Sequence, residues 1–141
     1  MRLWHKDLIS VLPHMQLLGQ WRECCAIARN ISVNGTPNHV LVNKIMDYPM
    51  SHFLRYSREI YNEMLNRGYS CNWNKLAQNL NVNGFRYCFT IDDIYQDWHN
   101  DRYLRQCLYN LEEKAMCGAI PKEEWKVITD IYGEKYDLYC G

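Results

Sequence analysis

Residues 13–31, with the sequence PHMQLLGQWRECCAIARNI, are the stretch that decides the fold. Pro13 suits the first turn of a helix, where its missing N–H costs nothing. On such a helix four residues fall at positions i, i+3, i+4 and i+7 and share one polar face. They are Gln16, Gly19, Gln20 and Glu23. The stretch therefore predicts a long helix that carries a polar stripe.

The other faces of this helix are apolar enough to anchor it. They carry Met15, Leu18, Trp21 and Cys25. Gly19 interrupts the polar stripe, and a glycine inside a helix costs up to about 1 kcal/mol relative to alanine. Close approach of another backbone is one common reason for such a glycine. From spacing alone, Glu23 could equally be an ordinary carboxylate on a solvated helix face.

Helices continue along the chain. A turn is predicted at Asn34-Gly35. Thr36-Pro37 then looks like the start of a short helix, which would supply Val40, Leu41, Ile45 and Met46 to the core. Pro49 starts the next helix, which ends at Gly68. Its apolar residues at helical spacing are Phe53, Tyr56, Ile60 and Met64.

Residues 69–89 are rich in Asn and lack a clean period, so we expect mostly loop. Thr90 with Asp92 and Asp93 predicts a helix start. The helix would run to Gly118, with an apolar stripe of Leu104, Cys107, Leu108 and Leu111. Pro121 opens a last helix that Gly133 closes, with Trp125, Ile128 and Ile131 facing inward. The pattern predicts an all-α fold, with one helical domain over residues 1–133 and a poorly defined tail over residues 134–141.

Composition is that of an ordinary globular protein. The chain has 141 residues, of which 48% are hydrophobic and 23% charged. No run of about 18 apolar residues occurs, so no membrane span is predicted. The first residues, MRLWHKD, show no apolar signal region, and we expect a cytoplasmic protein. The seven cysteines are then reduced thiols in spacings that do not suit zinc, so neither a metal nor a cofactor is expected.

The formal net charge is zero, but the charges are unevenly distributed. Residues 1–70 contain eight Lys or Arg against five Asp or Glu, and residues 71–141 contain eight against eleven. A basic side built from the first half could face phosphates. The asymmetry is small and carries little weight alone.

Two segments resemble a known family. The segment LLGQWRE at residues 17–23, with the opening MRLW at residues 1–4, looks like the start of the phage-type pyrimidine-dimer DNA glycosylases, also called dimer-specific endonuclease V. The segment YNEMLNRGY at residues 61–69 matches that family's helix with its Arg-Gly-aromatic end. The opening also resembles a cellular branch of uncharacterised proteins related to that enzyme. The resemblance covers about the first half of the chain.

The resemblance implies a catalytic pair. In that family the terminal α-amine attacks C1′ of the damaged nucleotide and forms an imine. A free α-amine has an ordinary pKa of about 7.7–8.0, so a useful fraction is neutral near physiological pH. Here the amine belongs to Met1, because the bulky Arg2 disfavours removal of the initiator methionine, whereas better-known members expose a small residue. Glu23 matches the family's essential carboxylate, which stabilises charge on the sugar and removes a C2′ proton.

The resemblance also implies contacts with DNA. Arg2 and Arg22 match family arginines that hold phosphates beside the lesion, although each could be a plain surface arginine. The family has a histidine where this chain has Gln16, so His14 is a possible substitute. A second family arginine falls at Ala26, and Arg29 is its possible replacement. Gln20 completes the predicted DNA-binding set. The family's aromatic and basic C-terminal segment has no match in residues 132–136, YGEKY.

The sequence thus predicts a monomeric DNA repair glycosylase with AP lyase activity, whose partner is double-stranded DNA with a lesion or an abasic site. Two other functions stay open. One is a helical nucleic-acid-binding module that has lost the chemistry. The other is a protein-interaction domain that uses the many aromatic residues. A thiol enzyme built on Cys24 or Cys25 is a more remote alternative, because no histidine partner is visible at a predictable spacing.

Overall fold

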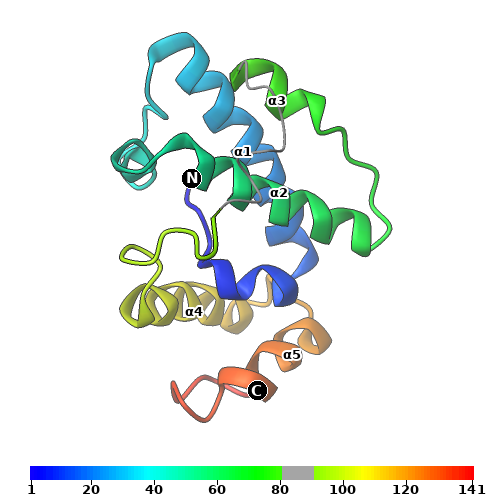
Figure 1. Ribbon diagram of the computed structural model, residues 1–141. Helices are drawn as coiled ribbons and strands as arrows, with labels where there is room; N and C mark the ends of the chain where they lie inside the picture. The colour runs from blue at the N-terminus through cyan, green and yellow to red at the C-terminus, as the bar shows by residue number, and fades with distance from the viewer. Residues whose placement is uncertain (81–90) are drawn as a thin grey trace.

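The computed structural model describes residues 1–80 and 91–141, and every element in this part of the chain is helical (Figure 1). Within the described residues, two 3₁₀ helices and five α-helices follow one another as η1 (Lys6–Val11), α1 (His14–Asn34), η2 (Asn43–Asp47), α2 (Met50–Asn66), α3 (Asn74–Leu80), α4 (Asp101–Met116) and α5 (Lys122–Tyr132). The prediction of an all-α fold is confirmed. No helix in the described part of the chain is long and apolar enough to cross a membrane.

The predicted helix boundaries hold where proline and glycine mark them. Pro13, Pro49 and Pro121 are the N-cap residues of α1, α2 and α5. Gly35 ends α1 with a φ of 81°, in the left-handed region that glycine enters without steric cost. These residues punctuate the chain because their backbone preferences are local and need no tertiary support.

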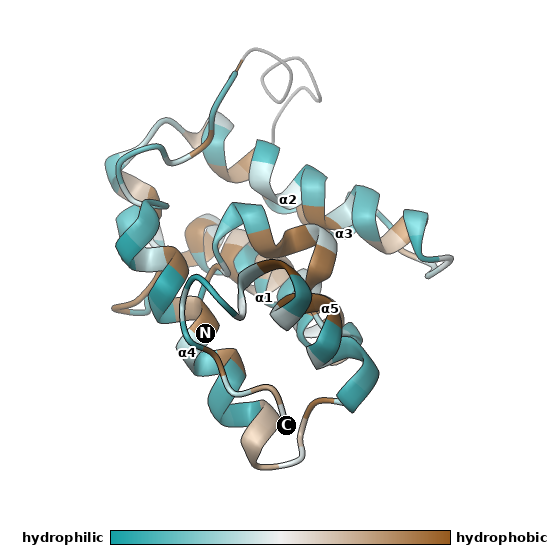
Figure 2. Cartoon of the chain, turned by 90° about the horizontal axis from the view of Figure 1, so that it is seen from below, coloured by the Kyte–Doolittle hydropathy of each residue, from teal (hydrophilic) through white to brown (hydrophobic). Residues whose placement is uncertain are grey.

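The core lies where α1, α2 and the beginning of the chain meet, and Figure 2 shows the hydrophobic parts of α1 and α2 gathered in the middle of the molecule. The buried residues of α1 are Leu17, Gln20, Trp21, Cys24, Ile27 and Ala28. The predicted anchor Met15 is instead 53% exposed. The inward face is therefore rotated from the expected one and includes the polar Gln20.

The short helix expected after Thr36-Pro37 is wrong. The Thr36 hydroxyl accepts a hydrogen bond from the Asn38 N–H and stabilises a turn, and helical structure resumes only at η2. Val40 is 83% and Leu41 53% exposed, so neither joins the core, and Met46 is exposed too. Only Ile45 of the four expected residues is buried.

Two further boundaries differ from the prediction. Within the segment expected to be loop, residues 74–80 form α3, which packs on α1 through the buried Leu76. The predicted helix start at Thr90 lies outside the described residues, and Asp92 and Asp93 belong to an irregular segment. The helix α4 begins only at Asp101, because the Asn100 side chain accepts a hydrogen bond from the Tyr103 N–H at 2.9 Å and caps it.

The last segment packs back on the molecule. Beyond α5, Tyr136 and Leu138 are buried, and the Trp125 indole N–H donates to the Tyr139 carbonyl at 2.7 Å. Ile131, which was expected to face inward, is 57% exposed. Because α5 contacts η1, this C-terminal unit supports the beginning of the chain from below in Figure 1.

Candidate active site

The first five residues form a segment threaded between α1 and α2 on one side and α4 on the other (Figure 1). Leu3, Trp4 and His5 are buried, whereas Met1 and Arg2 are half-buried at its outer end. An extended segment has no backbone partners of its own. Side chains from the surrounding helices must therefore satisfy it.

Gln20 satisfies this segment from α1. Its Oε1 accepts a hydrogen bond from the Trp4 N–H at 2.8 Å, and its Nε2 donates to the Arg2 carbonyl at 2.9 Å. Gln20 is only 1% exposed. A buried amide with both ends paired to backbone is a strong positional constraint, because breaking either pair leaves a buried polar group unsatisfied.

Two tyrosines hold the same segment from other helices. The Tyr56 hydroxyl of α2 donates to the Trp4 carbonyl at 2.6 Å and lies 3.0 Å from the Gln20 Oε1. The Tyr103 hydroxyl of α4 donates to the Leu3 carbonyl. Burial raises the pKa of both phenols, so both keep the proton that they donate.

Two histidines complete the attachment where the segment enters η1. The His99 Nδ1 accepts from the Lys6 N–H at 3.0 Å, and the His5 Nδ1 accepts from the Asp7 N–H at 3.1 Å. The His5 Nε2 therefore carries the proton and donates to the His99 carbonyl at 2.9 Å. Burial lowers the pKa of His5 and takes the pKa of His99 to about 2, so both rings are neutral.

The outer end of the segment lies against Glu23. The Arg2 N–H donates to the Glu23 Oε2 at 3.3 Å, and the Gln20 Nε2 lies 3.5 Å from the same oxygen. Consecutive backbone nitrogens are at most about 3.6 Å apart, so the Met1 nitrogen lies within roughly 7 Å of this carboxylate oxygen. Met1, Arg2, Trp4 and Glu23 line one open cleft of about 430 Å³. The structure thus brings an amine and a carboxylate to the same cleft.

The opposite wall of this cleft comes from the C-terminal half of α4 and the turn after it. Its residues are Asn110, Glu113, Lys114, Cys117 and Ala119. Sequence reasoning missed this wall. Residues 110, 113, 114 and 117 follow helical i, i+3, i+4 and i+7 spacing and so share one face, but the sequence does not say what that face meets.

The predicted DNA-binding arginines occupy two places. Arg2 lines the cleft, and its guanidinium lies 5.1 Å from the centre of the Trp4 ring. Arg22 and Arg29 are exposed on α1 and are not among the residues that line the cleft. They lie on the neighbouring face of the helix.

His14 and Gln16 lie away from the cleft. His14 begins α1, and its backbone N–H and its Nδ1 contact the Glu124 Oε1 at 2.7 and 3.0 Å. Nine residues of helix separate it from Glu23, a distance of about 13 Å. The structure therefore places His14 in a contact between α1 and α5. Gln16 lies nearer, about two turns from Glu23, and its Oε1 is buried without a hydrogen-bond partner among the described residues.

No other part of the described chain approaches Gly19 closely. A Cβ atom built at Gly19 would have no heavy atom outside its own helix turn within 4 Å. The backbone of Arg2 and Trp4, which passes this face of α1, is hydrogen-bonded to the end of the Gln20 side chain and does not contact Gly19. Nothing in the structure explains the helix-weakening glycine.

Burial makes the two adjacent cysteines of α1 poor nucleophiles. Burial raises the pKa of Cys24 and of Cys25, so both stay as thiols rather than nucleophilic thiolates. Within residues 1–80 and 91–141, no group of three or more His, Cys, Asp or Glu residues is arranged to hold a metal ion.

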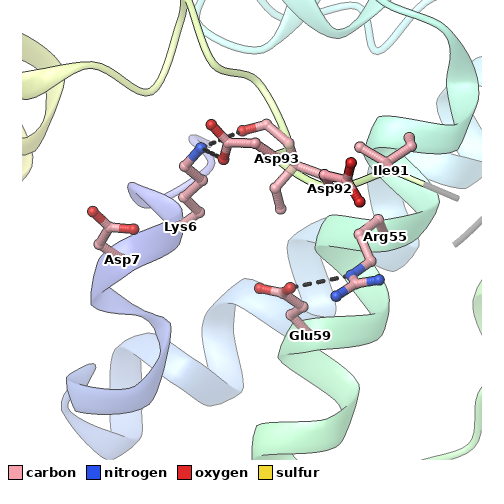
Figure 3. A pocket seen from close by; sticks show the side chains of 8 residues that line it. Lys6, Asp7, Arg55, Glu59, Ile91, Asp92 and Asp93 are labelled. Atoms are coloured by element: carbon pink, nitrogen blue, oxygen red, sulfur yellow. Dashed lines mark hydrogen bonds and ion pairs between the residues drawn. The ribbon is translucent and has the colours of Figure 1, made fainter. Parts of the chain in front are cut away.

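A second pocket has the wrong charge for a nucleic acid. Figure 3 shows Lys6 of η1 reaching toward Asp93, and Arg55 of α2 toward Glu59. Lys6 also donates to the Ile94 carbonyl at 2.7 Å. Asp7 and Asp92 line the same pocket. With four carboxylates against two ion-paired cations, this pocket repels phosphate, and the contacts of Lys6 serve to tie residues 91–94 to η1.

The fold and the cleft define a small all-helical protein that holds the beginning of its own chain beside a carboxylate. Comparison of the sequence with known protein families then identifies the family. The family described as pyrimidine dimer DNA glycosylase matches residues 1–76, more than half of the chain, and the protein belongs to that family. The match covers the first segment, α1, η2 and α2, whereas α4 and α5 lie beyond it. No curated protein and no solved structure shows a significant match.

Proposed function

We propose that this protein is a DNA glycosylase with coupled AP lyase activity, in which the α-amine of Met1 is the nucleophile and Glu23 the catalytic carboxylate. The observation that carries the proposal is the hydrogen bond of 3.3 Å between the Arg2 N–H and the Glu23 carboxylate at the mouth of a shared cleft. Membership of the family supports DNA as the substrate.

In the glycosylase step the amine attacks C1′ of the damaged nucleotide. The N–C1′ bond forms while the bond from C1′ to the base breaks, and the base leaves with the electron pair and takes up a proton. Positive charge that develops on the sugar lies beside the negative Glu23, which stabilises it. Loss of the amine proton and opening of the sugar ring at O4′ give the imine.

In the lyase step Glu23 removes a proton from C2′. The C3′–O bond breaks, the 3′ phosphate leaves with the electron pair, and water hydrolyses the unsaturated imine to free the amine. Gln20 has a positioning role in this scheme. Its amide is used up by the Arg2 carbonyl and the Trp4 N–H, which favours orientation of the amine over direct contact with DNA.

The surroundings of the cleft fit a nucleotide. Arg2 and Lys114 place positive charge on opposite walls, where phosphates beside the lesion could bind. We propose Arg22 and Arg29 as further phosphate contacts on the adjoining face of α1. The open form of the cleft suits a displaced nucleotide, whose extrusion costs a few kcal/mol and least at a damaged step. Pyrimidine dimers are the first lesion to test, followed by other modified bases and abasic sites.

The test is borohydride trapping on DNA with one abasic site. Borohydride reduces an imine to a stable amine, so a covalent complex reports the nucleophilic step. Untagged protein beginning at Met1 should form the complex, and protein with two extra residues before Met1 should lose it. Because Met1 is half-buried at the edge of the cleft, this extension should leave the fold intact, which circular dichroism checks.

The variant Glu23→Gln separates DNA binding from strand cleavage. It should still bind abasic DNA and should lower strand cleavage by a factor of about 10² or more, the usual scale of a general base. Absence of any adduct from folded, untagged protein that binds the same DNA would reject the enzyme and favour the non-catalytic binding module.

A further inference from the structure

A groove between α1 and α3 adjoins the catalytic cleft. It is open, with a volume of about 630 Å³. We call it the basic groove and define it by Arg29, Asn30 and Asn34 of α1 together with Lys75, Gln78 and Asn79 of α3. The helix α3 forms one whole wall, and sequence reasoning had assigned this segment to a loop.

The charge of the basic groove is of one sign. Arg29 and Lys75 are both exposed, and no carboxylate is among the described residues that line the groove. The other polar residues are amides, which can donate to an anion. The chain has zero formal net charge, so a concavity lined by two cations and no acid attracts anions more strongly than the average surface of the protein does.

The basic groove and the cleft are separate hollows that meet neighbouring positions of α1. Ala26 lines the groove and lies three residues after Glu23, so their side chains are neighbours about 5–6 Å apart at Cβ. Arg22 and Arg29 are seven residues apart and lie on nearly the same exposed face, about 10.5 Å along the axis. Each base pair advances DNA by 3.4 Å, so this spacing matches roughly three steps of a duplex.

We propose that the basic groove binds the sugar–phosphate backbone of the DNA strand about three nucleotides from the reacting sugar, with Lys75 and Arg29 contacting phosphates. This inference rests on the proposed function in taking damaged DNA as the ligand. It adds α3 to the binding surface and predicts that these contacts are independent of sequence and lesion, because they address only phosphate.

The test measures how DNA binding depends on salt. All proteins carry Glu23→Gln to prevent turnover, and the probe is a duplex with a single tetrahydrofuran abasic analogue. Dissociation constants are measured between 50 and 200 mM salt for four proteins. They are the Glu23→Gln parent, the parent with Lys75→Gln, the parent with Arg29→Gln, and the parent with both substitutions. The matched control is Lys122→Gln, which removes one exposed positive charge from α5 at a residue that lines neither the groove nor the cleft.

Each lost phosphate contact should reduce the slope of log K against log salt by about 0.9, which shrinks the loss of affinity across this salt range by roughly threefold. Lys75→Gln and Arg29→Gln should each show this change, and the double variant should show about twice as much. The control should keep the parent slope. The same reduction on an undamaged duplex would support a contact with backbone alone.

A slope for Lys75→Gln equal to that of Lys122→Gln would overturn the proposal, as would a parent protein that binds no DNA. Failure of the proposed function gives a different result. If Lys75→Gln changes the salt slope but the protein that keeps Glu23 forms no borohydride adduct, the proposed catalysis is rejected and the proposed phosphate contact is retained. Both substituted side chains are exposed, so loss of binding through unfolding is excluded by an unchanged thermal midpoint.

Discussion

Gln20 links the stability of this protein to its proposed chemistry. A glutamine on a helix is usually a surface residue. Here the Gln20 amide is hydrogen-bonded to the backbone of Arg2 and Trp4, and its oxygen also accepts a hydrogen bond from the Tyr56 hydroxyl. The sequence suggested a shared polar face for Gln20 and Glu23. It could not separate their roles, because whether a polar side chain meets DNA or its own chain is decided by tertiary contacts.

Replacement of Gln20 by alanine should destabilise the protein by about 2–4 kcal/mol, because the Trp4 N–H and the Arg2 carbonyl both lose a buried partner. The free energy of unfolding from urea titration measures this effect. At concentrations where the protein stays folded, the rate of borohydride trapping should fall more than the affinity for abasic DNA falls.

The matched control is Gln16→Ala on the same helix. Its buried amide oxygen has no partner within the described residues, so its removal should change the free energy of unfolding much less. Equal losses for the two variants would contradict the positional role of Gln20. A Gln20→Glu protein that folds and traps normally would contradict it too, since a carboxylate cannot donate to the Arg2 carbonyl.

At the scale of elements, α1, α2, α4 and α5 could be predicted and α3 could not. The four long helices have apolar residues at helical spacing, and three of them follow a proline. By contrast, α3 is a seven-residue helix in an Asn-rich segment. So short a helix is not stable alone, and its existence depends on packing against α1, which no local pattern reveals.

Leu76 tests this dependence. It is fully buried beneath α3, so Leu76→Ala should cost about 2–4 kcal/mol of unfolding free energy through lost burial and a cavity. The control Leu65→Ala, on the exposed side of α2, should cost less than about 1 kcal/mol. A near-zero cost at Leu76, measured by the same urea titration, would mean that α3 is not packed as described.

The far wall of the cleft is another element that only the structure supplies. Lys114 on α4 faces the cleft that contains Met1 and Glu23, and it lies outside the matched residues 1–76. If this wall takes part in binding, Lys114→Gln should weaken the binding of abasic DNA several-fold. Lys122→Gln on α5 is again the charge-matched control, and equal affinities for the two proteins would remove α4 from the binding surface.

At the scale of the whole molecule, buried neutral histidines connect stability to pH. Burial lowers the pKa of His5 and His52, and burial together with His5 and Lys6 takes the pKa of His99 to about 2. An unfolded histidine titrates near pH 6.5. Below that pH the unfolded chain binds protons that the folded protein does not, so stability falls as the pH falls and is retained above about 6.5.

His99 alone should lower the free energy of unfolding by roughly 1 kcal/mol for each pH unit between 6 and 5. Urea titrations at pH 7.5, 6.5, 5.5 and 5.0 measure this slope. His99→Asn offers an acceptor to the Lys6 N–H without a titrating ring. Its free energy of unfolding should therefore depend less steeply on pH, by the amount that corresponds to the uptake of about one proton on unfolding. Stability that is flat or rises from pH 6.5 to 5 would contradict the neutral histidines.

The all-α fold and the position of Met1 and Glu23 at one cleft could be predicted together, because both depend on the first helix and the segment before it, whereas the catalytic role of the two residues stays a proposal. The proposed path of DNA could not be predicted, because it depends on where α3 and α4 lie relative to α1. His14 shows that closeness in the sequence does not predict a shared site. It lies two residues before Gln16, yet its side chain contacts Glu124, which is 110 positions away along the chain. The matched first half carries the proposed chemistry, whereas the second half shapes the cleft around it.

The central claim is that the nucleophile is the amine of Met1. The most direct measurement is tandem mass spectrometry of the peptide that carries the sugar remnant after borohydride trapping on abasic DNA and nuclease digestion. The account predicts that the mass is added at the α-amine of Met1, with Lys6 and Lys114 unmodified. An adduct on the Lys114 side chain, which lines the same cleft, would show that an imine forms there with a different nucleophile and would contradict the account.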